Sequence, residues 1–184
     1  YKNDNEVRLL AIVNGDVDYK SQSLQLASAP ALLDGQQGGN YTVDLRPEIT
    51  LGVFSFNVTH EDPAKRAVFN DVRFREAMSI AINRQELNEV GFFGQGTPQQ
   101  YVGFSPKPEF ISDKWLNYKT DFDAAAANAL LDQVGMKDTD GDGFRELPNG
   151  EKLVIAMSFS TQGIAGQTVE LVAQYWADVG IQSV

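Results

Sequence analysis

Two segments in the second half of the chain end in the same way, and this shared ending constrains the fold strongly. "FDAAAANALLDQVGM" (residues 122–136) and "AGQTVELVAQYWADVGI" (165–181) carry apolar residues at helical spacing and close with Val-Gly and an apolar residue. Glycine just after a helix ends it, so each segment predicts a helix that turns into a strand. Between them, "EKLVIAMSFS" (151–160) is apolar at odd and even positions, which predicts a strand covered on both faces. Alternating helices and strands predict an α/β fold.

The first half contains one long amphipathic segment, "DVRFREAMSIAINRQELNEV" (71–90). Phe74, Ala77, Met78 and Ala81 follow the i, i+3, i+4, i+7 spacing of a buried helical face. This pattern predicts a single helix that ends at the glycine after Val90, with Val90 itself on the widened apolar stripe. A shorter helix is expected over residues 6–13, and strands over 16–19, 41–47 and 49–57. Loops or polar connections are expected over 32–40, 58–70 and 91–115.

Composition excludes several classes of function. The net charge of −10 disfavours nucleic-acid binding, which needs clustered Lys and Arg. No apolar run approaches the roughly 20 residues that span a bilayer. The chain has no cysteine, which excludes thiol catalysis and cysteine-ligated zinc. His60 is the only histidine and stands in a polar stretch, so we interpret it as a solvated side chain and not as a catalytic base.

The acidic run "DTDGDG" (138–143) is the most conspicuous candidate for a metal site. Its aspartates have the spacing of positions 1, 3 and 5 of an EF-hand loop, but position 12 is Asn149 where a bidentate Glu is required. Pro148 and Asn149-Gly150 then predict a turn into a strand, where an EF-hand needs a helix. Two interpretations stay open: a tight turn shaped by Asp and Gly, which we favour, or a calcium site of another type. The ligands of such a site would be Asp138, Asp140, Asp142 and Glu146.

Aromatic residues gather in the long segment between residues 92 and 115. Aromatic side chains among glycines and prolines either hold a loop on the core or line a binding cleft, where their faces contact peptide groups or sugars. Tyr101, Phe104 and Trp115 are the candidates for ligand binding.

Four phrases, in this order, resemble one protein family. They are "NGDVDY" (14–19), "FSFN" (54–57), "FNDVRFREAMSIAINRQELNEVGFFGQGTP" (69–98) and "FDAAAANALLDQVGMKDTDGDGFRELPNGEKLVI" (122–155). Together they are similar to the extracellular solute-binding proteins of family 5, which serve ABC importers of peptides, nickel and oligosaccharides. The long helix of that family reads roughly D-x-R-x-R-x-A-x-x-x-A-I-[DN]-R, and the stretch from Asp71 to Arg84 matches it.

The resemblance implies the following expectations about the fold and the organisation of the chain. The fold would be part of a periplasmic-binding-protein-like (class II) α/β lobe, a mixed sheet flanked by helices. Residues 1–55 would belong to the first lobe, and 56–184 would form the N-terminal part of the C-terminal lobe. The insert 58–69 is longer than the usual link of the family. The sequence would be about a third of a receptor, which fits a chain that begins "YKNDNEV" without Met or signal peptide.

The function implied by the resemblance is non-catalytic. Such a receptor closes two lobes around a peptide or oligosaccharide and presents it to membrane permease subunits, outside the cell or in the periplasm, as a lipoprotein. In peptide-binding members the acidic residue that holds the ligand's amino group has no counterpart in this sequence. No cofactor is expected apart from the calcium alternative. The rival interpretations are a glycoside hydrolase-like enzyme with a carboxylate pair, and a calcium-binding structural module.

Overall fold

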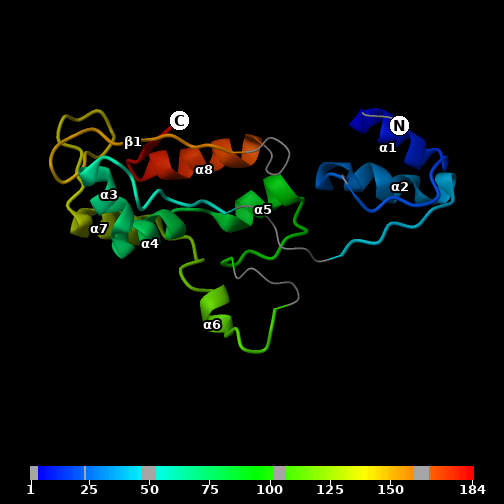
Figure 1. Cartoon of the computed structure of the whole chain (residues 1–184), viewed down its shortest axis with the longest axis horizontal. Coiled ribbons are helices and arrows are strands. Elements are labelled where there is room, and N and C mark those ends of the chain that lie inside the picture. Colours follow the sequence, from blue (N-terminus) through cyan, green and yellow to red (C-terminus); the bar gives the residue numbers. More distant parts are fainter. Residues whose placement is uncertain (1–3, 23, 47–52, 102–106, 160–165) are drawn as a thin grey trace. The chain divides into compact units, whose positions relative to one another are not determined.

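A computed structural model of the chain describes residues 4–22, 24–46, 53–101, 107–159 and 166–184. The chain forms two compact units, Tyr1–Glu48 and Ile49–Val184, which are described separately (Figure 1). Phe54 belongs to the second unit, because its ring packs edge-on against Trp176 with 5.5 Å between centroids. The division of a complete receptor into lobes between residues 55 and 56 stays a prediction.

The first unit is a helical hairpin, in which α1 (Asn5–Val13) packs on α2 (Ala29–Gly39) after the short 3₁₀ helix η1 (Leu26–Ser28). The interpretation of residues 32–40 as a loop was wrong. Glycines there permit close helix contact: a Cβ on Gly39 would lie 2.5 Å from the Val13 carbonyl oxygen. The described residues of the expected strands at 16–19 and 41–47 have irregular backbone, as do 53–57. Residues 47 and 49–52 lie outside the described part.

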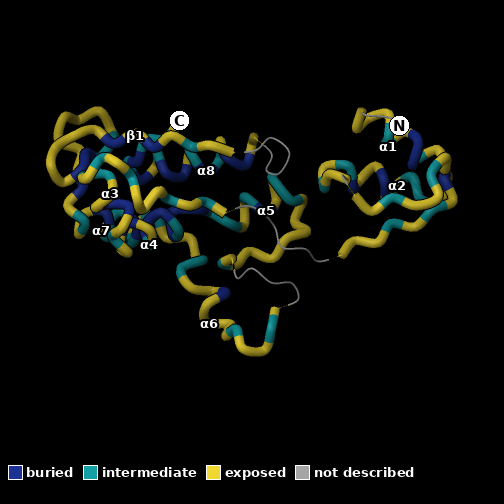
Figure 2. The backbone as a smooth tube through the Cα atoms, viewed as in Figure 1, coloured by how far each residue is buried: buried dark blue, intermediate teal, exposed yellow. Residues whose placement is uncertain are grey.

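The core of the second unit lies where α4 (Val72–Ile80), α7 (Ala124–Val134) and α8 (Gly166–Asp178) meet (Figure 2). The indole N–H of Trp176 donates to the Met78 carbonyl oxygen at 3.1 Å, which joins α8 to α4 inside this core. The helix predicted from the 122–136 segment is confirmed at both ends, with Asp123 as its N-cap and Gly135 in the left-handed conformation after it. The fully buried side chains include Phe74, Ala77, Ala127, Leu131, Met136 and Val172.

The single helix expected over residues 71–90 is two helices, α4 and α5 (Arg84–Phe92). The break at residues 81–83 is capped by Asn83, whose Oδ1 accepts from the Glu86 backbone N–H. Arg84 supplies a second reason for the break, because its guanidinium donates to the Ser79 carbonyl oxygen at 2.7 Å. After the break the stripe changes direction, and Val90 is exposed.

The polar connection expected at 58–70 contains a further helix, α3 (Pro63–Asn70). Asp62 caps it, accepting from the backbone N–H groups of Ala64 and Lys65, and Pro63 takes the first helical position. Asp-Pro followed by helix-forming residues is a known start signal, so this helix was accessible from the sequence.

The sheet of the described residues consists of β1 (Val154–Ile155) and β2 (Gln182–Ser183), which pair in parallel through the α8 crossover. The strand predicted over residues 151–160 is confirmed only at Val154–Ile155 among the described residues, and its expected burial on both faces was wrong. Leu153 and Ile155 are buried, whereas Val154 and Ala156 are exposed, so this strand is buried on one face only. No helix among the described residues is long and apolar enough to cross a membrane.

Candidate functional site

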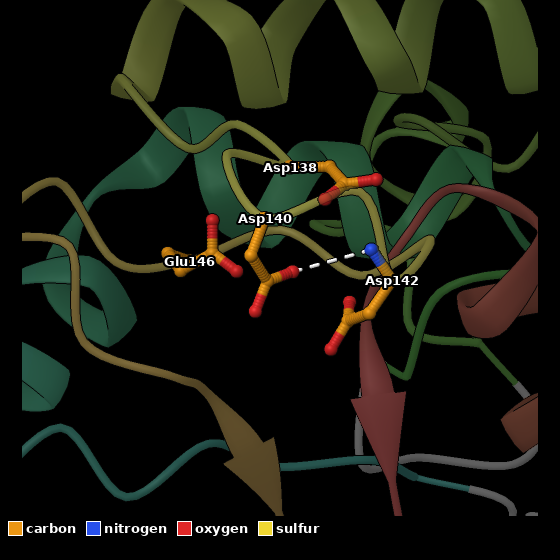
Figure 3. Close-up of side chains that lie close together, drawn as sticks. All are labelled: Asp138, Asp140, Asp142 and Glu146. Carbon is orange, nitrogen blue, oxygen red and sulfur yellow. Dashed lines mark hydrogen bonds between the residues drawn. The ribbon is translucent and has the colours of Figure 1, made fainter.

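The acidic turn, residues 138–146, follows α7 and leads into β1. Carboxylate oxygens of Asp138, Asp140, Asp142 and Glu146 all lie within 4.8 Å of one another (Figure 3). The three aspartates are exposed, and Glu146 is buried. Isolated antiparallel bridges join Glu146 to Lys137 and to Lys152. The run therefore lies in a hairpin-like turn, as the sequence predicted, and no EF-hand helix follows it.

The carboxylates of this turn accept hydrogen bonds from its own backbone. Asp138 accepts from the N–H groups of Gly141 and Gly143 at 2.7 and 3.0 Å. Asp140 accepts from the N–H of Asp142 at 3.2 Å, the contact drawn in Figure 3. Gly141 and Gly143 have positive φ, which glycine adopts without strain. The sequence of alternating Asp and Gly is thus accounted for by the geometry of the turn.

Lys152 adds a cation that the sequence analysis missed. Its ammonium lies 2.8 Å from a carboxylate oxygen of Asp140 and 2.5 Å from one of Asp142. The hydrogen bonds to Asp140 and Asp142 raise the pKa of Lys152, and the bond from Lys152 lowers the pKa of Asp142. Nothing in the pattern of the turn itself identifies a partner ten residues away across a hairpin.

The chemistry of the four carboxylates suits calcium, which prefers oxygen ligands. In this structure the ammonium of Lys152 already supplies positive charge between two of them. The calcium site therefore stays a prediction, and the turn has a structural explanation without it.

A polar cleft of about 540 Å³ lies beside the acidic turn, bordered by the helix ends of α7 and α8. Arg145 lines this cleft, and its guanidinium is hydrogen-bonded to other groups of the protein. It donates to Asp132 at 2.6 Å, to Asn128 at 2.9 Å, and to the carbonyl oxygens of Met136 and Val179 at 2.7 and 3.1 Å. We therefore interpret this arginine as a structural cross-link.

The second candidate site is the aromatic arm, which we define as the described residues 107–120. It contains the short helix α6 (Asp113–Leu116), capped by Ser112. Trp115 in this helix has 56% of its surface exposed, and Tyr118 just after it has 40%. Their ring centroids lie 5.8 Å apart at an interplanar angle of 53°.

Two contacts with α4 fix the end of this arm. The Tyr118 hydroxyl donates to the Glu76 carboxylate at 2.5 Å, and the ammonium of Lys119 lies 3.3 Å from the same carboxylate. The hydrogen bond to Glu76 raises the pKa of Tyr118 and lowers the pKa of Glu76. Lys119 has the positive φ of 54°, an unusual conformation for a residue with a side chain.

Ser79 and Gln100 form a further anchor. The Ser79 hydroxyl donates to the Lys119 carbonyl oxygen at 2.8 Å and accepts from Arg84 and Gln100. Gln100 also donates from its side chain to the Tyr118 carbonyl oxygen at 2.7 Å, and its backbone N–H donates to Leu116 at 2.7 Å. The arm is thus attached to the core by hydrogen bonds at several places.

The candidate ligand-binding residues have different outcomes. Trp115 and Tyr101 are exposed, with Tyr101 directly after Gln100, which is bonded to the arm. Phe104 lies outside the described residues. The sequence analysis missed Tyr118 and Glu76, and no local signal connects them, because they are 42 positions apart. The lone His60 is partly buried, and its Nδ1 accepts from the backbone N–H of Asp62.

Comparison with known proteins decides the family. The sequence model of the bacterial extracellular solute-binding proteins, family 5 Middle, matches residues 1–183. The chain belongs to this family. As a family 5 protein it has the α/β fold that the sequence predicted, with a small sheet in the described residues. Oligopeptide-binding protein OppA is 32% identical, with a TM-score of 0.76 over 100% of this chain and 30% of that one.

Two curated relatives extend the comparison. The periplasmic alpha-galactoside-binding protein of Rhizobium meliloti is 31% identical over 121 residues, which are 59% of this chain and 17% of that protein. A probable ABC transporter-binding protein of Deinococcus radiodurans is 24% identical over 174 residues, 93% of this chain and 29% of that protein. The chain therefore spans less than a third of the length of these curated relatives.

Proposed function

We propose that this chain is part of the solute-binding subunit of an ABC importer. The observation that carries the proposal is the family match over residues 1–183. The similarity to proteins named for oligopeptides, for alpha-galactosides and for ABC transport supports a peptide or an oligosaccharide as the solute. The work of such a subunit is reversible binding, and we propose no catalytic residue.

Capture by a receptor of this kind is a hinge motion that closes two lobes around the solute. The closed receptor would then deliver the solute to permease subunits in the membrane. We further propose that the protein acts in the periplasm or outside the cell, held at the membrane as a lipoprotein.

The test uses the polypeptide as its gene encodes it in full. Purified protein is titrated by calorimetry with short peptides and with neutral oligosaccharides, and bound material is then analysed by mass spectrometry. We expect saturable binding of one class, with the ligand recovered intact. Hydrolysis of the ligand, or no binding of either class, would contradict the proposal.

The 184-residue chain alone provides a second measurement. It covers less than a third of its relatives, so closure of two complete lobes around the ligand would not be available to it. We expect it to bind the same ligand at least about a hundredfold more weakly, a loss of about 2.7 kcal/mol. Equal affinity of the two proteins would show that closure contributes nothing.

A further inference from the structure

The aromatic arm presents two rings on a surface that is firmly held. The Tyr118 hydroxyl is bonded to Glu76 in α4, and the backbone around it is bonded to Ser79 and Gln100. A ring that is already fixed loses little conformational entropy when a ligand stacks on it. The indole of Trp115 remains more than half exposed although it belongs to this fixed segment.

We propose that Trp115 and Tyr118 form a stacking platform for a neutral oligosaccharide. This inference rests on the proposed function, because it names the class of solute that the receptor would take. A pyranose ring presents C–H groups on its faces and hydroxyls at its edge, so it stacks on an aromatic face while its rim is hydrogen-bonded. Lys114, exposed on the arm, supplies an ammonium near the Trp115 ring, and the exposed Asn117 donates from its amide to the Asp113 carbonyl oxygen at 3.1 Å.

The charges around the rings favour a neutral ligand over a peptide. Lys107 is paired with Asp113 at 2.9 Å, and Lys119 with Glu76 at 3.3 Å. The ammonium of Lys114 lies 5.1 Å from the Trp115 ring centroid, in a cation–π contact. A peptide needs charged groups for its termini, and Asp113 and two of the three lysines of the arm already have partners of opposite charge.

Fluorescence provides the assay, because the chain has two tryptophans with opposite environments. Trp176 is buried, with its indole N–H bonded to Met78, whereas Trp115 is exposed. The difference in acrylamide quenching between the wild type and Trp115→Phe therefore isolates Trp115, because every other tryptophan contributes equally to both proteins. In the full-length polypeptide, stachyose or mannohexaose is expected to lower the quenching constant about twofold or more by covering the indole, and pentaalanine to leave it unchanged.

Variants separate the two rings from their anchor. Trp115→Ala is expected to weaken oligosaccharide binding about tenfold, as loss of one stacked ring implies. Tyr118→Phe keeps the ring but loses the bond to Glu76. Its affinity is expected to fall about threefold, because a looser ring costs more entropy to fix. Tyr19→Ala removes an exposed tyrosine from the other unit and is the matched control, expected to bind as the wild type does.

The outcomes are distinguishable. Tight oligosaccharide or peptide binding that Trp115→Ala leaves unchanged would overturn the platform and leave the proposed function intact. Peptide binding that depends on Trp115 would overturn the assigned class of ligand. If acrylamide does not quench Trp115 in the ligand-free full-length protein, the polypeptide itself covers the indole and the platform is refuted. Failure to bind either class would refute the proposed function.

Discussion

Replacement of Met78 tests the core of the second unit most directly. Met78 lies on α4 with 1% of its surface exposed, and its carbonyl oxygen accepts from Trp176. Met78→Ala removes buried methylene groups and the thioether, which costs about 2–5 kcal/mol depending on how far the cavity collapses. Met78→Leu keeps the volume and is expected to cost less than about 1.5 kcal/mol.

Met78→Asp adds a further penalty because a carboxylate enters a site without a partner. An uncompensated buried charge costs about 3–5 kcal/mol in proteins, more than a neutral polar group does. The combined loss approaches the total stability of a typical domain, about 5–15 kcal/mol. We therefore expect this variant to be largely unfolded at 25 °C, whereas Met78→Ala stays folded and measurable.

Urea unfolding followed by tryptophan emission measures these differences, because Trp176 moves from the core into water. Val90→Asp is the matched control, since Val90 is exposed on α5 and the same substitution there is expected to cost less than about 1 kcal/mol. Equal losses for Met78→Asp and Val90→Asp would refute the placement of α4 in the core and the break between the two helices.

Three further predictions concern charged groups. Unfolding temperatures in millimolar calcium and in EDTA are expected to agree, because Lys152 already pairs with Asp140 and Asp142 and the turn's backbone N–H groups donate to Asp138; a rise with calcium that Asp140→Ala abolishes would instead reveal a metal site. Acid is expected to destabilise the fold, because the hydrogen bond from Arg73 lowers the pKa of Asp71, the N-cap of α4, below its ordinary value. The stability that Asp71 contributes is present above its unfolded pKa and is lost as the pH falls through its folded pKa. Between pH 5 and 3 the urea midpoint of Asp71→Asn should therefore depend less on pH than that of the wild type. Arg145→Lys is expected to lower the unfolding free energy by about 2–4 kcal/mol, because one ammonium cannot replace a guanidinium with four acceptors; a loss below about 0.5 kcal/mol would contradict this.

Elements with local signals could be predicted from the sequence. Helix α7 combines a capping Asp123, a buried apolar face and a terminal Gly135, and each of these is a property of neighbouring residues. Strand β1 and the turn from α8 into β2 also have local signals in the sequence. Agreement of several local signals is the reason that these predictions were right.

Elements that depend on distant contacts could not be predicted. The glycines of α2 indicated a loop because glycine weakens an isolated helix, yet at Gly39 a side chain would collide with Val13 of α1. The break before α5 depends partly on Arg84, which also reaches the Thr120 carbonyl oxygen. Likewise, the partner of the acidic turn, Lys152, and the partner of Tyr118, Glu76, become neighbours only after the chain has folded.

Arg145 connects the C-terminal ends of two helices through one guanidinium. The carbonyl oxygens of Met136, two residues after α7, and of Val179, directly after α8, both accept from it. A cation near a helix C-terminus interacts favourably with the helix dipole, and here a single charge stabilises two helix ends. Fraying of either helix end breaks one bond of the guanidinium that also holds the other end, so we expect the two ends to open together. The amides of Met136 and Ile181, each bonded into its own helix end, are then expected to show similar opening free energies in hydrogen exchange.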